Sequence, residues 1–348
     1  MNCAVEMFRG RKVRDARWRA LKFLAGTLPV FVLLAASLAA NSPVVDASRQ
    51  FEAGNYQQAV AILQAALPQS AQDAALHYWL GRSYYELGDY DHAVNSAQRA
   101  VELAPGNSEY HLWLGRACGA KAEHAGWFSG LSLAKKTRQE FEEAVRLDPS
   151  NFAAQRDLIE FYYRAPGIVG GGDDKALRQM EALAALDPVE GHVARGAYWV
   201  DKKKVDQAEA EFRQVLGARP KRVSPYLEVA DFYLSRNDAA HMEEAVEAAA
   251  RVNPADRRLI YYRAVERILA GDRLPEAEQG LKKYLETVPR RSDLPAHSSA
   301  HEWLGRLCER EGKCNAAVEQ YRKALDLDPR SKTARDAVRR LRRCPPGE

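Results

Sequence analysis

Residues 74–107 read AALHYWLGRSYYELGDYDHAVNSAQRAVELAPGN, and this stretch decides the fold. It contains Trp-Leu-Gly-Arg at 79–82, and the same four residues return at 113–116 and at 303–306. The first two copies are 34 residues apart, a period typical of a repeat made of two helices and a turn. Because such repeats bury their apolar faces against their neighbours, a chain of 348 residues needs no single large core. The sequence therefore predicts an all-α solenoid.

The local signals within this stretch define two antiparallel helices. The spacing predicts one helix over residues 74–87 and a second over residues 90–103. Gly88 suits the left-handed cap that ends a helix, and Pro105 cannot continue the second helix. Gly81 and Ala93 are small, which allows the two helices to approach closely.

These positions closely resemble the tetratricopeptide repeat. The first unit matches its pattern in register, and so does the last: Leu304, Gly305, Gly312, Ala317, Tyr321, Ala324 and Pro329. Prolines mark the ends of about eight units, at Pro68, Pro105, Pro149, Pro188, Pro220, Pro254, Pro289 and Pro329. The resemblance implies a right-handed α–α superhelix over residues 44–329, with a capping helix over about 331–343 and a basic tail completing residues 330–348.

The formal net charge of +4 is concentrated at the two ends of the chain. Residues 1–40 and residues 330–348 each carry seven Lys or Arg and two Asp or Glu. Residues 41–329 therefore have a net charge of about −6. A protein that binds nucleic acid normally carries a basic stripe through its folded domain. This distribution argues against a nucleic-acid partner.

Residues 1–40 have the layout of a secretory signal peptide. A positively charged start is followed by an apolar run over residues 23–40 and by small residues before Asn41. The alternative is an uncleaved anchor, because a run of 18 residues approaches the length that spans a bilayer; Gly26 and Pro29 interrupt it. We expect export to the periplasm or beyond, or, in the alternative, anchoring at the inner membrane by residues 23–40.

The cysteines fit an oxidising compartment. Cys308 and Cys314 lie six residues apart, across the turn of the last repeat, where antiparallel helices can bring side chains within bonding range. We expect a Cys308–Cys314 disulfide, with two buried thiols as the alternative.

Two adjacent units are longer than the others. One carries about ten extra residues near 122–131, including Trp127 and Phe128, and the next carries Ala-Pro-Gly-Ile-Val-Gly-Gly-Gly from Ala165. This pair of insertions resembles a group of exported bacterial tetratricopeptide repeat proteins without an assigned activity. We expect Trp127 and Phe128 to pack against the second insertion and so be buried; exposed, they would be binding anchors.

The glycine-rich insertion, residues 165–173, invites a phosphate-binding interpretation because backbone N–H groups can hold an anion. The insertion includes Pro166, Gly170, Gly171 and Gly172, and it continues into Asp173 and Asp174. Those acids would repel phosphate and suit the capping of the next helix. We therefore interpret the segment as structural, with ligand or partner contact as the alternative.

No motif predicts catalysis, a metal or a cofactor. His297 and His301 share a helix face at the spacing of a metal pair, but no further ligand is evident. The chain has no Gly-x-Ser-x-Gly motif, and its paired carboxylates are typical of solvated helix surfaces. We expect no enzymatic activity.

The resemblance places the binding surface on the inner wall of the superhelix, which the first helix of each repeat lines. The residues that it assigns there are Tyr78, Arg82, Tyr85, Arg116, Arg156, Tyr163 and Arg164. Arg and Tyr are enriched at interface hot spots, so this wall would suit an extended peptide or an acidic segment of a protein. The alternative is a solvated groove in which each Arg pairs with a neighbouring carboxylate.

We therefore predict a non-catalytic scaffold of the bacterial cell envelope that binds a polypeptide in its concave groove. One alternative is a membrane-anchored factor of envelope biogenesis. Another is an accessory subunit of an enzyme that uses the glycine-rich insertion as a ligand site. The tail arginines, Arg339, Arg340, Arg342 and Arg343, can also contact anionic lipid at a membrane face. The sequence does not define the oligomeric state.

Overall fold

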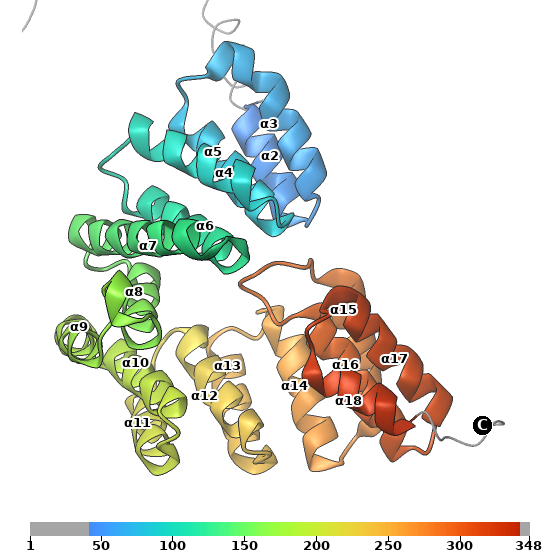
Figure 1. Ribbon diagram of the computed structural model, residues 1–348. Helices are drawn as coiled ribbons and strands as arrows, with labels where there is room; N and C mark the ends of the chain where they lie inside the picture. Colours follow the sequence, from blue (N-terminus) through green and yellow to red (C-terminus); the bar gives the residue numbers. More distant parts are fainter. Residues whose placement is uncertain (1–41, 342–348) are drawn as a thin grey trace, which may run out of the picture.

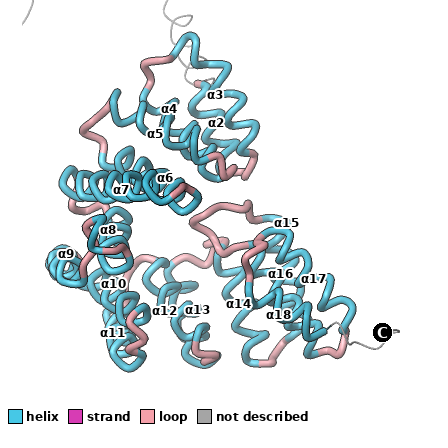
Figure 2. The backbone as a smooth tube through the Cα atoms, in the orientation of Figure 1, coloured by secondary structure: helices cyan, strands magenta, loops and turns pink. Residues whose placement is uncertain are grey.

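The structure is a computed structural model, and it describes residues 42–341. Within that range it contains 17 α-helices, one short 3₁₀ helix and no strand (Figures 1 and 2). Sixteen helices form eight consecutive pairs, and the last, α18 (Lys332–Arg340), follows the eighth pair. The pairs are α2–α3 (Pro43–Glu52, Tyr56–Ser70), α4–α5 (Ala74–Glu86, Tyr90–Leu103), α6–α7 (Ser108–His124, Trp127–Leu147), α8–α9 (Phe152–Arg164, Asp173–Leu186), α10–α11 (Pro188–Asp201, Val205–Ala218), α12–α13 (Val223–Ser235, Ala239–Val252), α14–α15 (Arg258–Ala270, Leu274–Thr287) and α16–α17 (His297–Arg310, Cys314–Leu327). The predicted all-α superhelix is confirmed.

The second pair shows why this sequence forms helices where it does. Asp73 caps α4 by accepting hydrogen bonds from two backbone N–H groups of its first turn, and Asp89 does the same for one in α5. Between the helices, Gly88 has a φ of +75°, the left-handed conformation that ends α4. A Cβ on Gly81 would lie only 3.1 Å from the backbone nitrogen of Ala97, so the helices could not pack this closely with a larger residue.

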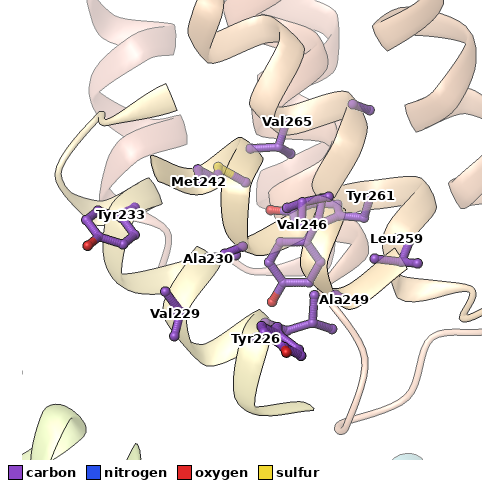
Figure 3. Packing of buried hydrophobic residues seen from close by; sticks show 14 of the residues in the cluster. Tyr226, Val229, Ala230, Tyr233, Met242, Val246, Ala249, Leu259, Tyr261 and Val265 are labelled. Carbon is purple, nitrogen blue, oxygen red and sulfur yellow. The ribbon is translucent and has the colours of Figure 1, made fainter. Parts of the chain in front are cut away.

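The core follows the array as a series of clusters. The longest cluster runs without interruption from Val193 on α10 to Leu307 on α16. Figure 3 shows its middle part, in which Val229 on α12, Val246 on α13 and Val265 on α14 belong to the same cluster. The two helices of each pair pack most extensively against each other, and the pair buries its remaining apolar faces against the preceding and following pairs, as expected of a solenoid.

One loop brings the two ends of the array together. Residues 288–296, which we call the clasp loop, connect α15 to α16 and extend to the first two pairs (Figure 1). There Arg291 pairs with Glu52 on α2. Ser292 donates two hydrogen bonds to the carboxylate of Glu86 on α4, from its backbone nitrogen at 3.0 Å and from its hydroxyl at 2.7 Å. The superhelix is therefore closed by contacts more than 200 residues apart.

The long α6–α7 unit places its extra residues in the helices. α6 has 17 residues and α7 has 21, whereas the helices of the neighbouring pairs have 13 or 14. Trp127 and Phe128 begin α7 at the tip of this hairpin, and they are 73% and 85% exposed. The expectation that they are buried against the glycine-rich insertion is therefore wrong, because the longer helices carry them to the hairpin tip.

The expected Cys308–Cys314 disulfide is also wrong. Cys308 is a free thiol that packs against the core between α17 and α18, beside Ala317 and Tyr321. Cys314 is the first residue of α17, and it is disulfide-bonded. Cys308 lies within α16, and its side chain packs against the cluster that α17 and α18 form rather than bonding to Cys314.

The last helix caps the C-terminal end of the array. α18 covers the last pair by packing Ala334 and Ala337 against it, and it is shorter than the predicted helix over 331–343. Residues 1–40, together with Arg342 and Arg343, lie outside the described residues. Among the helices of residues 42–341, none is long and apolar enough to cross a bilayer.

Candidate functional site

Arg82 lies in a cage of aromatic rings on the inner wall. The carbon at the centre of its guanidinium is 4.4 Å from the ring centre of Trp113, 4.5 Å from that of Phe51 and 4.9 Å from that of Trp79. Tyr78 adds a fourth ring at 5.5 Å. Because ring faces carry negative charge, such stacking stabilises a cation by about 0.5–2 kcal/mol. We call this group the Arg82 cage.

The repeat itself builds part of this cage. Within Trp-Leu-Gly-Arg the two end residues are three apart, so one helix face holds both. In all three copies the Arg lies over its own Trp, at 4.9 Å for Arg82, 4.9 Å for Arg116 and 4.2 Å for Arg306. The repeated Trp-Leu-Gly-Arg motif therefore specifies a stacked Trp–Arg pair as well as a small residue for helix packing.

The cage leaves hydrogen-bonding capacity of Arg82 unused. Its Nη1 donates to the hydroxyl of Tyr78 at 3.2 Å, and that hydroxyl donates to Glu109 at 3.2 Å. Its Nε is buried and has no hydrogen-bond partner among residues 42–341. Within the same residues Arg82 forms no salt bridge with a carboxylate. Arg82 is thus a cation surrounded by ring faces, and the nearby carboxylate of Glu86 acts on it only from beyond salt-bridge distance.

The other predicted arginines of the wall are paired. Arg116 donates to Asp157 at 2.6 Å. Arg156 lies 3.3 Å from Glu228 and 3.8 Å from the buried carboxylate of Glu190. Burial raises the pKa of Glu190, and the neighbouring Arg156 opposes that shift. This part of the wall matches the alternative that the sequence left open, an Arg with a carboxylate beside it.

Arg164, at the end of α8, shares this arrangement. It lies 2.6 Å from Glu160 and 3.3 Å from Asp201. Tyr163 packs edge-on against Tyr198, and burial raises its pKa to about 12. Its hydroxyl therefore stays protonated at neutral pH.

A cleft of about 840 Å³ joins these two parts of the wall. Tyr85 and Arg116 line it from α4 and α6, and Arg164 lines it from α8. Burial raises the pKa of Tyr85 to about 12. Ser292 and Asp293 of the clasp loop also line the cleft. The cleft therefore brings Tyr85, Arg116 and Arg164 together, while Tyr78 and Arg82 lie in the neighbouring cage and Arg156 and Tyr163 line a smaller adjoining hollow.

The glycine-rich insertion uses its own backbone donors. The N–H of Gly170 donates to Gly167, that of Gly171 to Pro166, and that of Gly172 to Tyr162 at the end of α8. Lys175 donates its ammonium to the carbonyl of Gly170 at 2.8 Å. Because these donors already have acceptors, this arrangement does not offer them to an anion.

The ends of this insertion differ slightly from the prediction. Gly172, rather than Asp173 or Asp174, precedes α9 as its N-cap, and both acids lie in the first turn. Val169 of the short 3₁₀ helix (Gly167–Val169) is buried, whereas the exposed Ile168 faces outward. Pro166 and Gly167 supply the carbonyl groups that accept the bonds of the glycines.

The histidines and the tail arginines have local partners. His297 contacts the carbonyl of Val288 at 2.9 Å, and His301 contacts Gln320 at 2.8 Å. In the part of the chain that the structure describes, no group of three or more His, Cys, Asp or Glu could hold a metal ion. Arg340 lies 2.7 Å from Glu309 and Arg339 lies 3.9 Å from Asp336.

Sequence reasoning missed two components of the inner wall. Trp79 and Trp113 were recognised as repeat markers, although their i, i+3 spacing to Arg signalled the cage. The clasp loop had no signal, because a contact between residues 86 and 292 leaves no trace in local spacing.

Comparison with known proteins agrees with this architecture. Residues 50–118 and residues 275–332 each match a tetratricopeptide repeat profile. Curated proteins gave no significant match in sequence. The solved structure of yeast Tom70 is 16% identical, with a TM-score of 0.55 over 82% of this chain and 58% of that chain. The chain thus spans little more than half of that protein.

Two bacterial tetratricopeptide repeat proteins are also similar. One, from Parabacteroides merdae, is 16% identical with a TM-score of 0.45, over 75% of this chain and 95% of its own. The other, from Thermus thermophilus, is 18% identical with a TM-score of 0.43, over 64% and 96%. The two matching profiles and the eight helix pairs together show that the chain contains tetratricopeptide repeats.

Proposed function

We propose that this protein is a scaffold of the bacterial cell envelope that holds a polypeptide segment on its inner wall, at the Arg82 cage and the adjoining cleft. Tetratricopeptide repeats generally mediate contacts between proteins and are generally non-catalytic. The partner, the site and the envelope location are the parts that this proposal adds.

The observation that carries the proposal is the state of Arg82. Arg116, Arg156 and Arg164 each have a carboxylate within 4 Å, whereas Arg82 has none at that distance among residues 42–341 and contacts ring faces and the hydroxyl of Tyr78. A carboxylate of a partner would add a charge-assisted hydrogen bond to a cation already held in place. Trp and Tyr around it are the residue types that dominate binding energy at interfaces.

The cleft supports a peptide of mixed character. Its wall combines Tyr85 and Phe161 with the paired ions Arg116 and Asp157. Tyrosine rings supply contact area with little loss of side-chain freedom, and the ion pair offers both signs of charge at one place. We infer that the bound segment is extended, with an acidic residue at the cage and apolar or aromatic residues in the cleft.

The envelope location depends on residues 1–40, which lie outside the described residues. The signal-peptide layout supports export, and an uncleaved anchor is the alternative. Sequencing the N-terminus of the mature protein distinguishes the two, since a start near Asn41 would exclude the anchor. The accessory-subunit alternative has no support from the glycine-rich insertion, whose backbone donors are already used.

The test begins with crosslinking in native cells to identify the captured polypeptide. Arg82→Glu combined with Arg116→Glu should then lower its affinity roughly tenfold or more, because both cations face the proposed segment. A second inner-wall variant, Arg82→Met with Arg116→Gln, removes the same two charges without placing a new carboxylate beside Asp157. The matched control is Arg99→Glu with Arg322→Glu, which changes as many charges on the second helices of their pairs.

Circular dichroism establishes that each variant keeps its helices. Unchanged capture by both inner-wall variants would refute the groove as the binding site. Equal losses in the control would mean that net charge, rather than this wall, determines capture.

A further inference from the structure

A second cavity lies away from the clasp loop and the Arg82 cage. It has a volume of about 950 Å³ and is bounded by α11, α12 and α13 together with the α11–α12 connection. We call it the α11–α13 pocket. Its walls come from the second helices of two neighbouring repeats and the first helix of the later one. Nothing in the inner-wall proposal uses it.

The α11–α13 pocket is strongly basic. Arg213, Arg219, Lys221 and Arg251 line it, and Glu244 is the only carboxylate among the residues that do so. Arg213 is partly neutralised by Glu209, 2.6 Å away. Four cations around one cavity are unexpected in an array whose net charge is about −6.

Three of these cations lack a balancing charge. Arg219, Lys221 and Arg251 form no salt bridge with any residue of the described range 42–341. All three are exposed, so an anion that enters the pocket would meet cations that no carboxylate of this range neutralises at close distance. Arg219 has a φ of +50°, the left-handed conformation that ends α11 at the edge of the pocket.

A buried tyrosine supplies an unused donor in the same pocket. Tyr233 is 1% exposed and lines the cavity, yet its hydroxyl has no hydrogen-bond partner in the described part of the chain. Figure 3 shows its ring at the edge of the core with the hydroxyl directed away from the neighbouring aliphatic side chains. Burial raises the pKa of Tyr233 and the nearby Arg213 opposes that shift, so the hydroxyl remains a donor at neutral pH.

Neighbouring contacts hold this ring in place. His241 stacks on Tyr233 with ring centres 4.8 Å apart, and Asp238 fixes the imidazole by a contact of 2.7 Å. Arg213 lies near the Tyr233 hydroxyl but can only donate to it, so the O–H group itself has no acceptor among residues 42–341. An acceptor that enters the cavity would use this donor.

We propose that the α11–α13 pocket binds a phosphate-bearing ligand, with Lys221 and Arg251 balancing its charge and the Tyr233 hydroxyl donating to one of its oxygens. A phosphate group suits this set, because it carries up to two negative charges and offers three oxygens that accept several hydrogen bonds at once. The ligand is either a small phosphorylated molecule in solution or a phospholipid headgroup, since both present the same group.

The experiment titrates the full chain, at low salt, with inorganic pyrophosphate and with vesicles of phosphatidylglycerol in phosphatidylcholine. Binding should weaken as salt is added. Lys221→Glu with Arg251→Glu should lower the affinity roughly tenfold or more, since each removes a charge-assisted contact. Loss of both pyrophosphate and vesicle binding in this variant assigns a headgroup, whereas loss of pyrophosphate binding without any vesicle binding assigns a soluble ligand.

Tyr233→Phe is the sharper variant. It should weaken binding roughly fivefold, because one hydrogen bond to the ligand is lost. The matched control, Lys283→Glu with Arg322→Glu, changes two cations outside the pocket and should bind as the natural sequence does.

Several results would overturn the proposal. One is that the natural sequence binds neither pyrophosphate nor the vesicles at low salt. Equal affinity of the natural sequence and the Lys221→Glu, Arg251→Glu variant is another. A control variant that loses binding to the same extent would show a general charge effect and would equally refute the site.

Discussion

The two adjacent insertions of this array reach opposite outcomes. The extra residues near 122–131 lengthen α6 and α7 and end in a tip where Trp127 and Phe128 are almost fully exposed. The glycine-rich insertion folds back on the end of α8, buries Val169 and pairs the N–H groups of Gly170, Gly171 and Gly172 with backbone carbonyls. The first insertion leaves two aromatic rings exposed, whereas the second exposes Ile168 but satisfies these backbone donors internally.

The two insertions differ in whether they satisfy their own backbone polar groups or expose aromatic side chains, and this property determines the role of each. A segment that satisfies its own polar groups becomes part of the scaffold, and its residues contribute to stability. A segment that exposes aromatic rings gains little stability from them, and the exposed rings form a surface that suits contact with a partner. This comparison predicts a graded effect of substitutions, large in the glycine-rich insertion and small at the hairpin tip.

The largest effect is expected for Gly171→Ala. A Cβ at this position would overlap the carbonyl group of Ala165, and that backbone cannot yield as a side chain would. We expect the free energy of unfolding to fall by about 3 kcal/mol, as for other substitutions that overfill a packed site. Urea denaturation followed by circular dichroism measures this change.

Gly167→Ala is the matched control within the same insertion. A Cβ there meets no atom within 4 Å, so the free energy of unfolding should stay within about 0.5 kcal/mol of its original value. Equal stability of the two variants would show that the insertion is not packed as described.

An intermediate effect is expected for Arg138→Ala, because Arg138 joins the insertion to α7. Its guanidinium lies against Gly170, and its Nη1 contacts Glu142 at 3.0 Å. Glu142 in turn accepts a hydrogen bond from the hydroxyl of Tyr162 at 2.8 Å. We expect a loss of about 1 kcal/mol, since both packing and an ion pair disappear.

Arg146→Ala tests whether this loss comes from the insertion. Arg146 lies on the same helix and pairs with Glu143 at 2.6 Å, but its side chain is mostly exposed. The control should change stability by less than about 0.5 kcal/mol in the same denaturation experiment. A comparable loss in the two variants would contradict the role of Arg138 as a link.

Local sequence signals predicted the array because the residues that define each repeat lie close together in the sequence. Gly88, Pro105 and the small Gly81 fix a turn, an end and a close approach within one unit, and α5 spans Tyr90–Leu103 as the sequence predicts. The inner wall was only partly predictable. Their positions in the repeat predicted that Arg82 and Arg116 lie near each other. They did not predict that the two side chains have different surroundings.

Those surroundings depend on residues from other repeats. Asp157 pairs with Arg116 from α8, and Phe51 reaches Arg82 from α2, so neither partner can be read from spacing within one unit. The free thiol of Cys308 has the same explanation, because α18 and α17 supply the core against which it packs. For Arg82, Arg116 and Cys308, contacts between elements, rather than motifs, determine the surroundings that the sequence did not predict.

The smallest effect is expected at the hairpin tip. Trp127→Ser with Phe128→Ser removes two large rings, but both are already in water, so the free energy of unfolding should change by less than about 0.5 kcal/mol. The control is Phe141→Ala on the same helix, where a buried ring is lost at a cost of about 3–5 kcal/mol. Urea denaturation of the two variants compares them directly. A large loss for the tip variant would mean that Trp127 and Phe128 are covered in the folded protein, and the contrast between the two insertions would then fail.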